Sequence, residues 1–213
     1  VGRDGQVLAL GADVLVHARL AADAVGATKM DRPEWGAVNP LNNEVYMSLT
    51  NNSNRVDPTA SPTGNQLKPD AANPRYYDDG EGNKGNPNGH IIRWKETGSQ
   101  SATAFTWDIY LFGAENDAAA NVNLSGLTDV NDFSSPDGLY FDHRGLLWIQ
   151  TDDGAYTDVS NCMMLAAVPG QVGDGSKDVT AAGGTKTIVG ARATADTVRR
   201  FLVGPVECEI TGI

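Results

Sequence analysis

Two stretches of this chain, far apart in sequence, repeat one pattern. "EWGAVNPLNNEVYMSLTNN" (34–52) aligns with "DGLYFDHRGLLWIQTDDG" (137–154) when one gap is placed in the turn. Each copy has an apolar run, a turn rich in Asn, Pro or Gly, and a second apolar run, which is typical of an antiparallel hairpin. The alignment pairs three positions of the two copies: Val38 with Phe141, Tyr46 with Trp148, and Thr50 with Asp152.

Two more strands are expected after each hairpin. They are "GHIIRWKE" (89–96) and "ATAFTWDIYLF" (102–112) in the first copy, and "NCMMLAAV" (161–168) and "TVRRFLVG" (197–204) in the second. A four-stranded sheet that is repeated along a chain is the signature of a β-propeller blade, and a β-sandwich is the main alternative. Propellers have at least about four blades. We therefore expect an all-β fold in which residues 1–213 form about two antiparallel blades plus edge elements, as the C-terminal part of a larger propeller.

Other segments are less regular. Residues 51–88 have almost no aliphatic side chains and predict a long inserted loop, and loops of this length are usually functional or mobile. The spacing of apolar residues predicts a short helix near residues 17–25. Three tryptophans at alternating strand positions are expected in the core: Trp94, Trp107 and Trp148.

The charge of the chain limits its partners. A formal net charge of −11 argues against a nucleic-acid-binding surface and against anionic membranes, and fits a secreted protein or one that collects cations. No apolar run is long enough for a membrane span, and no signal peptide is visible. The chain begins at Val1 without a methionine, so we expect a segment of a longer protein, with its targeting signal upstream. We expect a monomer.

The repeat places acidic residues at one position. "RPE", "SPD" and "ECE" each end in an acid directly before a first strand, and these acids are Glu34, Asp137 and Glu209, the last at the start of a third copy. The first strand of a propeller blade lines the central channel, so the three carboxylates would converge there. Converging carboxylates repel one another unless a cation lies between them, and calcium is a cation that prefers oxygen ligands. Arg32 could hold a phosphate or carboxylate through two hydrogen bonds. For any one acid alone, a role as a strand cap or turn residue is the alternative.

The remaining candidates are weaker. Cys162 and Cys208 match no CxxC spacing and are expected to be buried free thiols. The three histidines, His17, His90 and His143, are expected at helix-end, strand and turn positions. "NNSN" (51–54) and "QTDD" (150–153) are explained by turn and strand-end roles. No GxSxG, HExxH, P-loop or GxGxxG motif is present.

Several segments together carry a family likeness. "DRPEWGAVNP", "EVYMSLTNNS", "NPNGHIIRWKE", "SSPDGLYFDHRGLLWIQTD" and "RRFLVGPVECEITG", in this order, resemble the PhoX family of bacterial alkaline phosphatases. The resemblance runs from about residue 13 to the end of the chain. It implies a propeller with an active site on its axis, which binds calcium and iron and hydrolyses phosphate esters. It also implies export to the periplasm or beyond by the twin-arginine pathway.

By position, the resemblance makes Arg32 a phosphate ligand and catalytic residue, and Glu34, Asp137 and Glu209 metal ligands. The chain departs from the family pattern at Glu207, which is an extra acid, and in a longer loop at 69–88. It also lacks the N-terminal half of the family, which bears further ligands, including a cysteine ligand to iron that neither Cys162 nor Cys208 replaces. We therefore expect the chain alone to be inactive. Two alternatives stay open: a non-catalytic calcium-binding propeller module, and a lactonase-like calcium-dependent propeller hydrolase.

Overall fold

The computed structural model describes residues 11–152, 154–175 and 178–212. Its elements, in chain order, are α1 (Gly11–Val16), α2 (Ala18–Ala24), β1 (Pro33–Val38), β2 (Val45–Leu49), β3 (Tyr77–Asp78), β4 (Lys84–Gly85), β5 (His90–Glu96), β6 (Phe105–Phe112), β7 (Pro136–Phe141), β8 (Leu147–Thr151), β9 (Met163–Ala167), β10 (Val179–Thr180), β11 (Lys186–Thr187) and β12 (Val198–Val203). Among the described residues, no helix has the length and apolar character that crossing a membrane requires.

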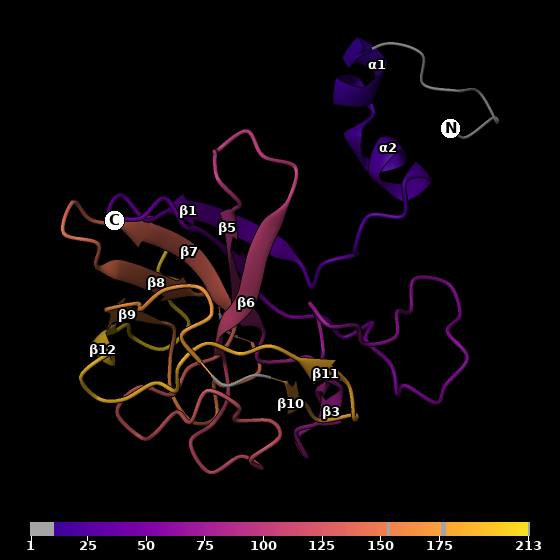
Figure 1. Ribbon diagram of the computed structural model, residues 1–213. Helices are drawn as coiled ribbons and strands as arrows, with labels where there is room; N and C mark the ends of the chain where they lie inside the picture. Colours follow the sequence, from indigo (N-terminus) through magenta and orange to yellow (C-terminus); the bar gives the residue numbers. More distant parts are fainter. Residues whose placement is uncertain (1–10, 153, 176–177, 213) are drawn as a thin grey trace.

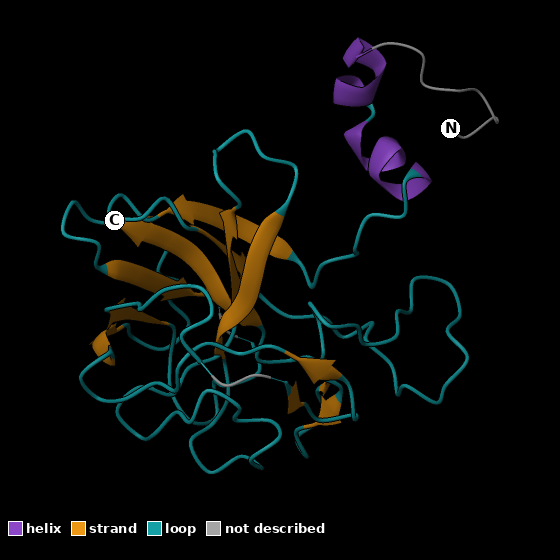
Figure 2. Ribbon diagram, in the orientation of Figure 1, coloured by secondary structure: helices purple, strands orange, loops and turns teal. Residues whose placement is uncertain are grey.

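The two repeats form two similar sheets. Their strand orders are β1-β2-β5-β6 and β7-β8-β9-β12, and every neighbouring pair is antiparallel. The hairpins expected within residues 34–52 and 137–154 are confirmed as β1–β2 and β7–β8 (Figure 1). Both sheets are open in the described residues, so the structure shows two blade-like meanders and no closed propeller (Figure 2).

The hydrophobic core lies between the two sheets. Tyr46 on β2 and Phe141 on β7 belong to one buried cluster, and their rings meet edge to face at 5.0 Å. Leu147 and Ile149 on β8 are completely buried in the same cluster, because alternate residues of a strand point to the same face. The first sheet therefore lies against the second through β2 and β7.

The expectation that the tryptophans form the core is met only in part: Trp107 packs against a small buried cluster of Ile109, Phe112 and Val189, but none of the three tryptophans is fully buried. Trp94, Trp107 and Trp148 are all half-buried. Trp148 lies between two core residues on β8, so its side chain points to the opposite face, where it meets the ring of Phe201 at 4.9 Å. Trp94 and Trp107 are direct partners across β5 and β6. The core between the sheets instead contains the smaller aromatic rings of Tyr46 and Phe141 together with aliphatic side chains.

The loop of residues 51–88 is anchored by buried arginines. Arg55 donates from Nε to Oδ1 of Asp31 at 2.6 Å, and both side chains are almost completely buried. Arg75 is completely buried and donates to the carbonyl oxygens of Gly113 at 2.6 Å and Val122 at 3.0 Å. A segment with so few aliphatic side chains gains little anchoring from hydrophobic burial. Here charged hydrogen bonds to the rest of the chain anchor it instead.

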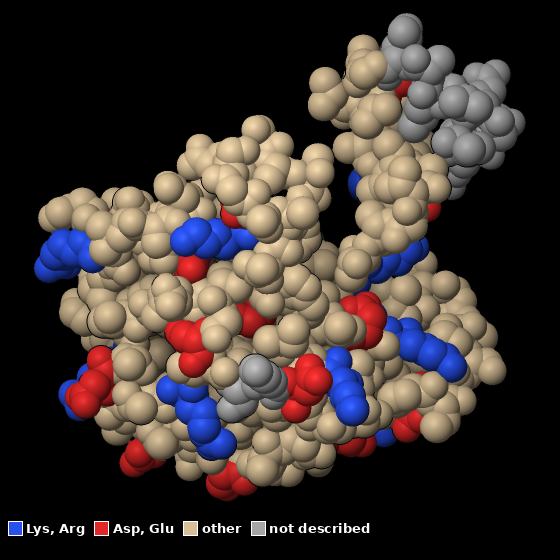
Figure 3. Space-filling model, in the orientation of Figure 1, with Lys and Arg blue, Asp and Glu red and all other residues tan. Residues whose placement is uncertain are grey.

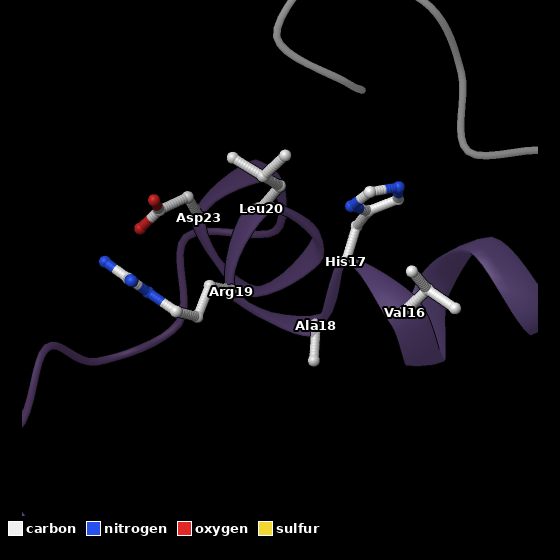
Figure 4. A pocket seen from close by; sticks show the side chains of 6 residues that line it. All are labelled: Val16, His17, Ala18, Arg19, Leu20 and Asp23. Carbon is white, nitrogen blue, oxygen red and sulfur yellow. The ribbon is translucent and has the colours of Figure 1, made fainter.

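The helical part differs from the prediction. A single helix near 17–25 was expected, but two short helices are present, separated at His17, which is exposed. Neither helix has a buried residue, and both extend away from the sheets (Figure 1). A hollow of about 650 Å³ lies beside them, and the described residues that line it all come from this one stretch (Figure 4). It therefore includes no part of the sheets.

Charged side chains are mixed on the surface. On the face shown in Figure 3, Lys and Arg alternate with Asp and Glu. The net charge of −11 is therefore not gathered into one patch on this face.

His90 is completely buried, which the sequence did not indicate. Its Nε2 lies 2.8 Å from the carbonyl oxygen of Ala72, and its Nδ1 lies 3.1 Å from Nδ2 of Asn86. Because the carbonyl can only accept and the Asn86 amide nitrogen donates, the ring is neutral with its proton on Nε2. Burial lowers the pKa of His90 to about 4.

This buried histidine makes stability depend on pH. The pKa of His90 falls from 6.5 when unfolded to about 4 in the folded chain, so the unfolded state binds more protons between these values. We expect the free energy of unfolding to fall as the pH is lowered from about 6.5 to 4, by up to about 3 kcal/mol from this residue. Urea unfolding at several pH values measures it. The free energy of unfolding should change less steeply with pH in His90→Gln than in the unsubstituted chain. An equal change with pH in both proteins would contradict the lowered pKa of His90.

Candidate metal centre

Three bends of the backbone share a positive φ angle. Arg32, Ser135 and Glu207 have φ values of 52°, 49° and 63°, in the left-handed region that residues other than glycine seldom adopt. Each bend stands two residues before an acid: Glu34, Asp137 and Glu209, respectively. Glu207, which departs from the family pattern in sequence, therefore occupies the same backbone position as Arg32 and Ser135. The third copy of the repeat thus begins with the same bend, although residues 204–212 form no strand.

The first two acids lie in equivalent β-bulges. Between β1 and β2 the register shifts from Pro33 to Gly36, and between β7 and β8 it shifts from Pro136 to Leu139. In each case one extra residue is accommodated in the first strand, and a bulge of this kind changes the direction of the side chains within it. The predicted equivalence of Glu34 and Asp137 is confirmed by this register.

The end of each hairpin is also equivalent. The backbone N–H of Thr50 donates to the carbonyl of Arg32 at 3.0 Å, and that of Asp152 donates to the carbonyl of Ser135 at 3.1 Å. Asp152 therefore occupies in the second hairpin the position that Thr50 has in the first. This position is at the open end of the hairpin, next to the bulge that contains Asp137.

Three carboxylates converge at this end of the second sheet. One oxygen from each of Asp137, Asp152 and Glu209 lies within 4.8 Å of the others. Two of the three expected acids, Asp137 and Glu209, are thus brought together with an acid that was not expected.

Glu34 lies next to this group, through Arg32. Nε of Arg32 donates to Oε1 of Glu34 at 2.7 Å, and its terminal nitrogen donates to Oδ2 of Asp152 at 3.3 Å. Arg32 therefore bridges the two hairpins, and all four predicted site residues lie in one neighbourhood.

The electrostatics of this neighbourhood favour a cation. Burial raises the pKa of Asp137, and the carboxylates of Glu34, Asp152 and Glu209 raise it further, against the opposing effect of Arg32. The hydrogen bond to Glu34 raises the pKa of Arg32. One guanidinium thus faces four carboxylates, and a bound cation would relieve their repulsion.

Sequence reasoning missed Asp152, because it interpreted "QTDD" as a strand end. The alignment of Asp152 with Thr50 was the available signal, since the end of the second strand of a hairpin lies beside the start of the first. Asp153 lies outside the described residues. Cys162 is buried as expected, but Cys208 is only half-buried. Within the described ranges, no cysteine or histidine joins the three carboxylates.

Comparison with known proteins agrees with the resemblance seen in the sequence. The family model of alkaline phosphatase PhoX matches residues 3–213. The chain belongs to the PhoX family. A solved structure, described as Pseudomonas fluorescens PhoX in complex with vanadate, a transition state analogue, is similar to this PhoX chain with 34% sequence identity and a TM-score of 0.66. The match covers 99% of this chain and 32% of that one, so this PhoX segment spans about a third of the length of its relative. No curated protein matches it.

Proposed function

We propose that this chain carries part of the active site of a calcium- and iron-dependent alkaline phosphatase that hydrolyses phosphate esters. One observation carries the proposal: in a chain of the PhoX family, Asp137, Asp152 and Glu209 converge beside Arg32. In this proposal Glu34, Asp137 and Glu209 are metal ligands, Asp152 is a further ligand, and Arg32 binds phosphate. The chain alone is inactive, because it spans only part of the length of its relative.

The donor set fits calcium. Calcium takes about 6–8 oxygen ligands and accepts carboxylates in variable geometry. The three converging side chains offer only oxygen, and Asp137 and Asp152 are half-buried, which limits competition from water. They supply part of such a shell, and water or other parts of the protein supply the rest. Iron rests on the resemblance to the family, and we assign its remaining ligands to residues outside this chain.

Arg32 is suited to the phosphoryl group. A guanidinium presents parallel N–H donors that match two oxygens of a phosphate. In the structure these donors are turned to Glu34 and Asp152. A bound cation would neutralise those acids and leave the guanidinium for the substrate. The vanadate complex of the Pseudomonas fluorescens protein supports a phosphoryl site in that relative. Metals bound here would polarise the phosphoryl oxygens, and Arg32 would offset the charge that develops on them.

A non-catalytic calcium module is the second candidate, because the described donor set contains only carboxylates. Colour distinguishes the two. Protein-bound iron absorbs visible light and calcium does not, so the purified full-length phosphatase is expected to be coloured. A colourless full-length protein that contains calcium alone would favour the module. The lactonase-like alternative gains no support from the family match.

Exposed apolar residues on the edge strands of the two sheets are consistent with a larger propeller. Trp35 on β1 is 53% exposed and Phe201 on β12 is 66% exposed, although both are large apolar residues on edge strands. We propose that further blades of the full-length protein cover these strands. Export by the twin-arginine pathway to the periplasm or beyond, and a monomeric state, are proposed from the family resemblance alone.

The cation site can be tested in the chain itself. We expect terbium, a luminescent substitute for calcium, to bind with a dissociation constant of about 10⁻⁴–10⁻³ M, because three carboxylates leave the shell incomplete. Asp137→Asn and Asp152→Asn should each weaken binding about tenfold, and Glu34→Gln should weaken it less. Calorimetric titration measures these affinities.

A matched control uses an acid outside the site. Asp129 is exposed and lies in the loop before β7, so Asp129→Asn should leave the affinity unchanged. If Asp137→Asn and Glu34→Gln have no more effect than this control, the two acids are strand-end residues and the proposed centre is wrong.

A further inference from the structure

One buried side chain next to the candidate metal centre has no hydrogen-bond partner. Gln150 on β8 is only 3% exposed, and its Nε2 is buried without a partner among the described residues. Its carboxamide oxygen lies over Gly138, where an added Cβ would stand 1.9 Å from it. Gly138 directly follows Asp137. An unsatisfied buried donor costs free energy, so its presence beside the acids needs a reason.

The first sheet shows what the equivalent residue does. The hairpin registers place Ser48 of β2 where β8 has Gln150. Oγ of Ser48 donates to the backbone carbonyl of Asp137 at 2.5 Å, and Oγ1 of Thr50 donates to the carbonyl of Pro136 at 2.9 Å. The second strand of the first copy therefore holds the acid-bearing residue of the second copy by its backbone.

By the same relation, residues of the second copy are expected to hold the backbone of the third copy. In the second copy Gln150 corresponds to Ser48 and Asp152 corresponds to Thr50. In the third copy Glu209 corresponds to Asp137. Asp152 cannot replace Thr50 as a donor, because a carboxylate only accepts. Gln150 is then the residue that can donate to the acid-bearing segment of the third copy.

The size of the side chains agrees with this role. In the first copy a large Trp35 follows the acid and the small Ser48 lies opposite; Ser48 accepts from the Trp35 backbone N–H at 2.9 Å. In the second copy the order of sizes is reversed, with Gly138 opposite Gln150. The absence of a side chain at Gly138 leaves room for a longer side chain, which reaches farther than a serine.

We propose that Gln150 positions Glu209 in the metal centre. When a cation draws Asp137, Asp152 and Glu209 together, Nε2 of Gln150 donates to the backbone carbonyl of Glu209, as Ser48 does to that of Asp137. Gln150 is a positioning residue and not a metal ligand. The inference rests on the proposed cation site.

The substitution Gln150→Met tests the role, because methionine has a similar length and no donor. In the 213-residue chain we expect terbium affinity to fall about fivefold or more. The midpoint of urea unfolding without metal should stay unchanged or rise, because the substitution removes an unsatisfied donor. Weaker metal binding without loss of stability is a result that a purely structural role would not produce.

Two further variants complete the experiment. Ser48→Ala removes the bond that already holds Asp137, so it should also weaken terbium binding. Gln171→Met, on an exposed loop residue, should not. If Gln150→Met binds terbium as the unsubstituted chain does, the role of Gln150 is refuted while the cation site stands. If the unsubstituted chain binds no terbium, the cation site and this inference both fail.

A spectroscopic readout is independent of affinity. The side-chain NH₂ resonances of Gln150 can be assigned by their loss in Gln150→Met. Saturation with calcium should slow their exchange with water, because a carbonyl acceptor protects them. Exchange that calcium leaves unaltered would overturn the proposed hydrogen bond.

Discussion

Replacing Arg32 by Ala in the proposed full-length phosphatase is expected to lower kcat/KM for an aryl phosphate at least about a hundredfold. This is the scale of losing one preorganised group that stabilises charge in a transition state. The expectation rests on the position of Arg32, whose guanidinium lies 2.7 Å from Glu34 and 3.3 Å from Asp152. Steady-state kinetics at saturating calcium measures the effect.

Two variants separate charge from geometry. Arg32→Lys keeps the charge and loses the paired donors, so its kcat/KM should lie between that of the unsubstituted protein and that of Arg32→Ala. Arg144→Ala removes an exposed arginine in the β7–β8 turn and should leave the rate unaltered. An unchanged rate for Arg32→Ala would remove Arg32 from the site. Robust, calcium-dependent turnover by the 213-residue chain alone would show that the catalytic groups have been misplaced.

Replacing Arg93 by Met is expected to destabilise the fold by about 3–5 kcal/mol, the cost of leaving a buried charge without its partner. Arg93 donates to both carboxylate oxygens of Asp108, at 2.6 Å and 3.0 Å, and neither side chain is exposed. It also donates to Asp174 at 2.6 Å, and its guanidinium lies over the ring of Tyr110. The free energy of unfolding in urea measures the loss.

A surface pair and a double substitution serve as controls. Arg144 pairs with Asp142 while largely exposed, so Arg144→Ala should cost less than about 1 kcal/mol. Adding Asp108→Leu to Arg93→Met should recover part of the loss, because it removes the uncompensated carboxylate. If Arg93→Met costs no more than Arg144→Ala, the buried pair does not stabilise the fold.

The sheets could be predicted from the sequence because hairpins are local. The alternation of apolar residues and the turns at 39–44 and 142–146 determine β1–β2 and β7–β8, and the repeat alone placed Glu34 and Asp137 in equivalent positions. The burial of Trp148 was not predictable in the same way. Alternation gives the two faces of a strand but not which face meets the other sheet.

The buried ion pairs could not be predicted from the sequence. Arg55 and Asp31 are separated by 24 residues, and Arg93 and Asp174 by 81, so no local pattern joins them. His90 is the first residue of β5, and its burial depends on contacts far along the chain, with Ala72 and Asn86 of the loop and with Phe112 of β6. Asp152 was missed for a related reason. An acid at the end of a strand has the same sequence signature whether it caps a turn or faces other acids.

The left-handed bends have a consequence for how this centre can change. Arg32, Ser135 and Glu207 share a positive φ but carry a positive, a neutral and a negative side chain. The side chains of Arg32 and Glu207 are exposed, so a charge at either position sets the local potential without being buried, whereas Ser135 is completely buried. Glu207 is therefore the bend at which evolution, or a protein engineer, could change the charge and retune the affinity of the centre for anions, because Arg32 holds Glu34 and Asp152 by hydrogen bonds and Ser135 is buried.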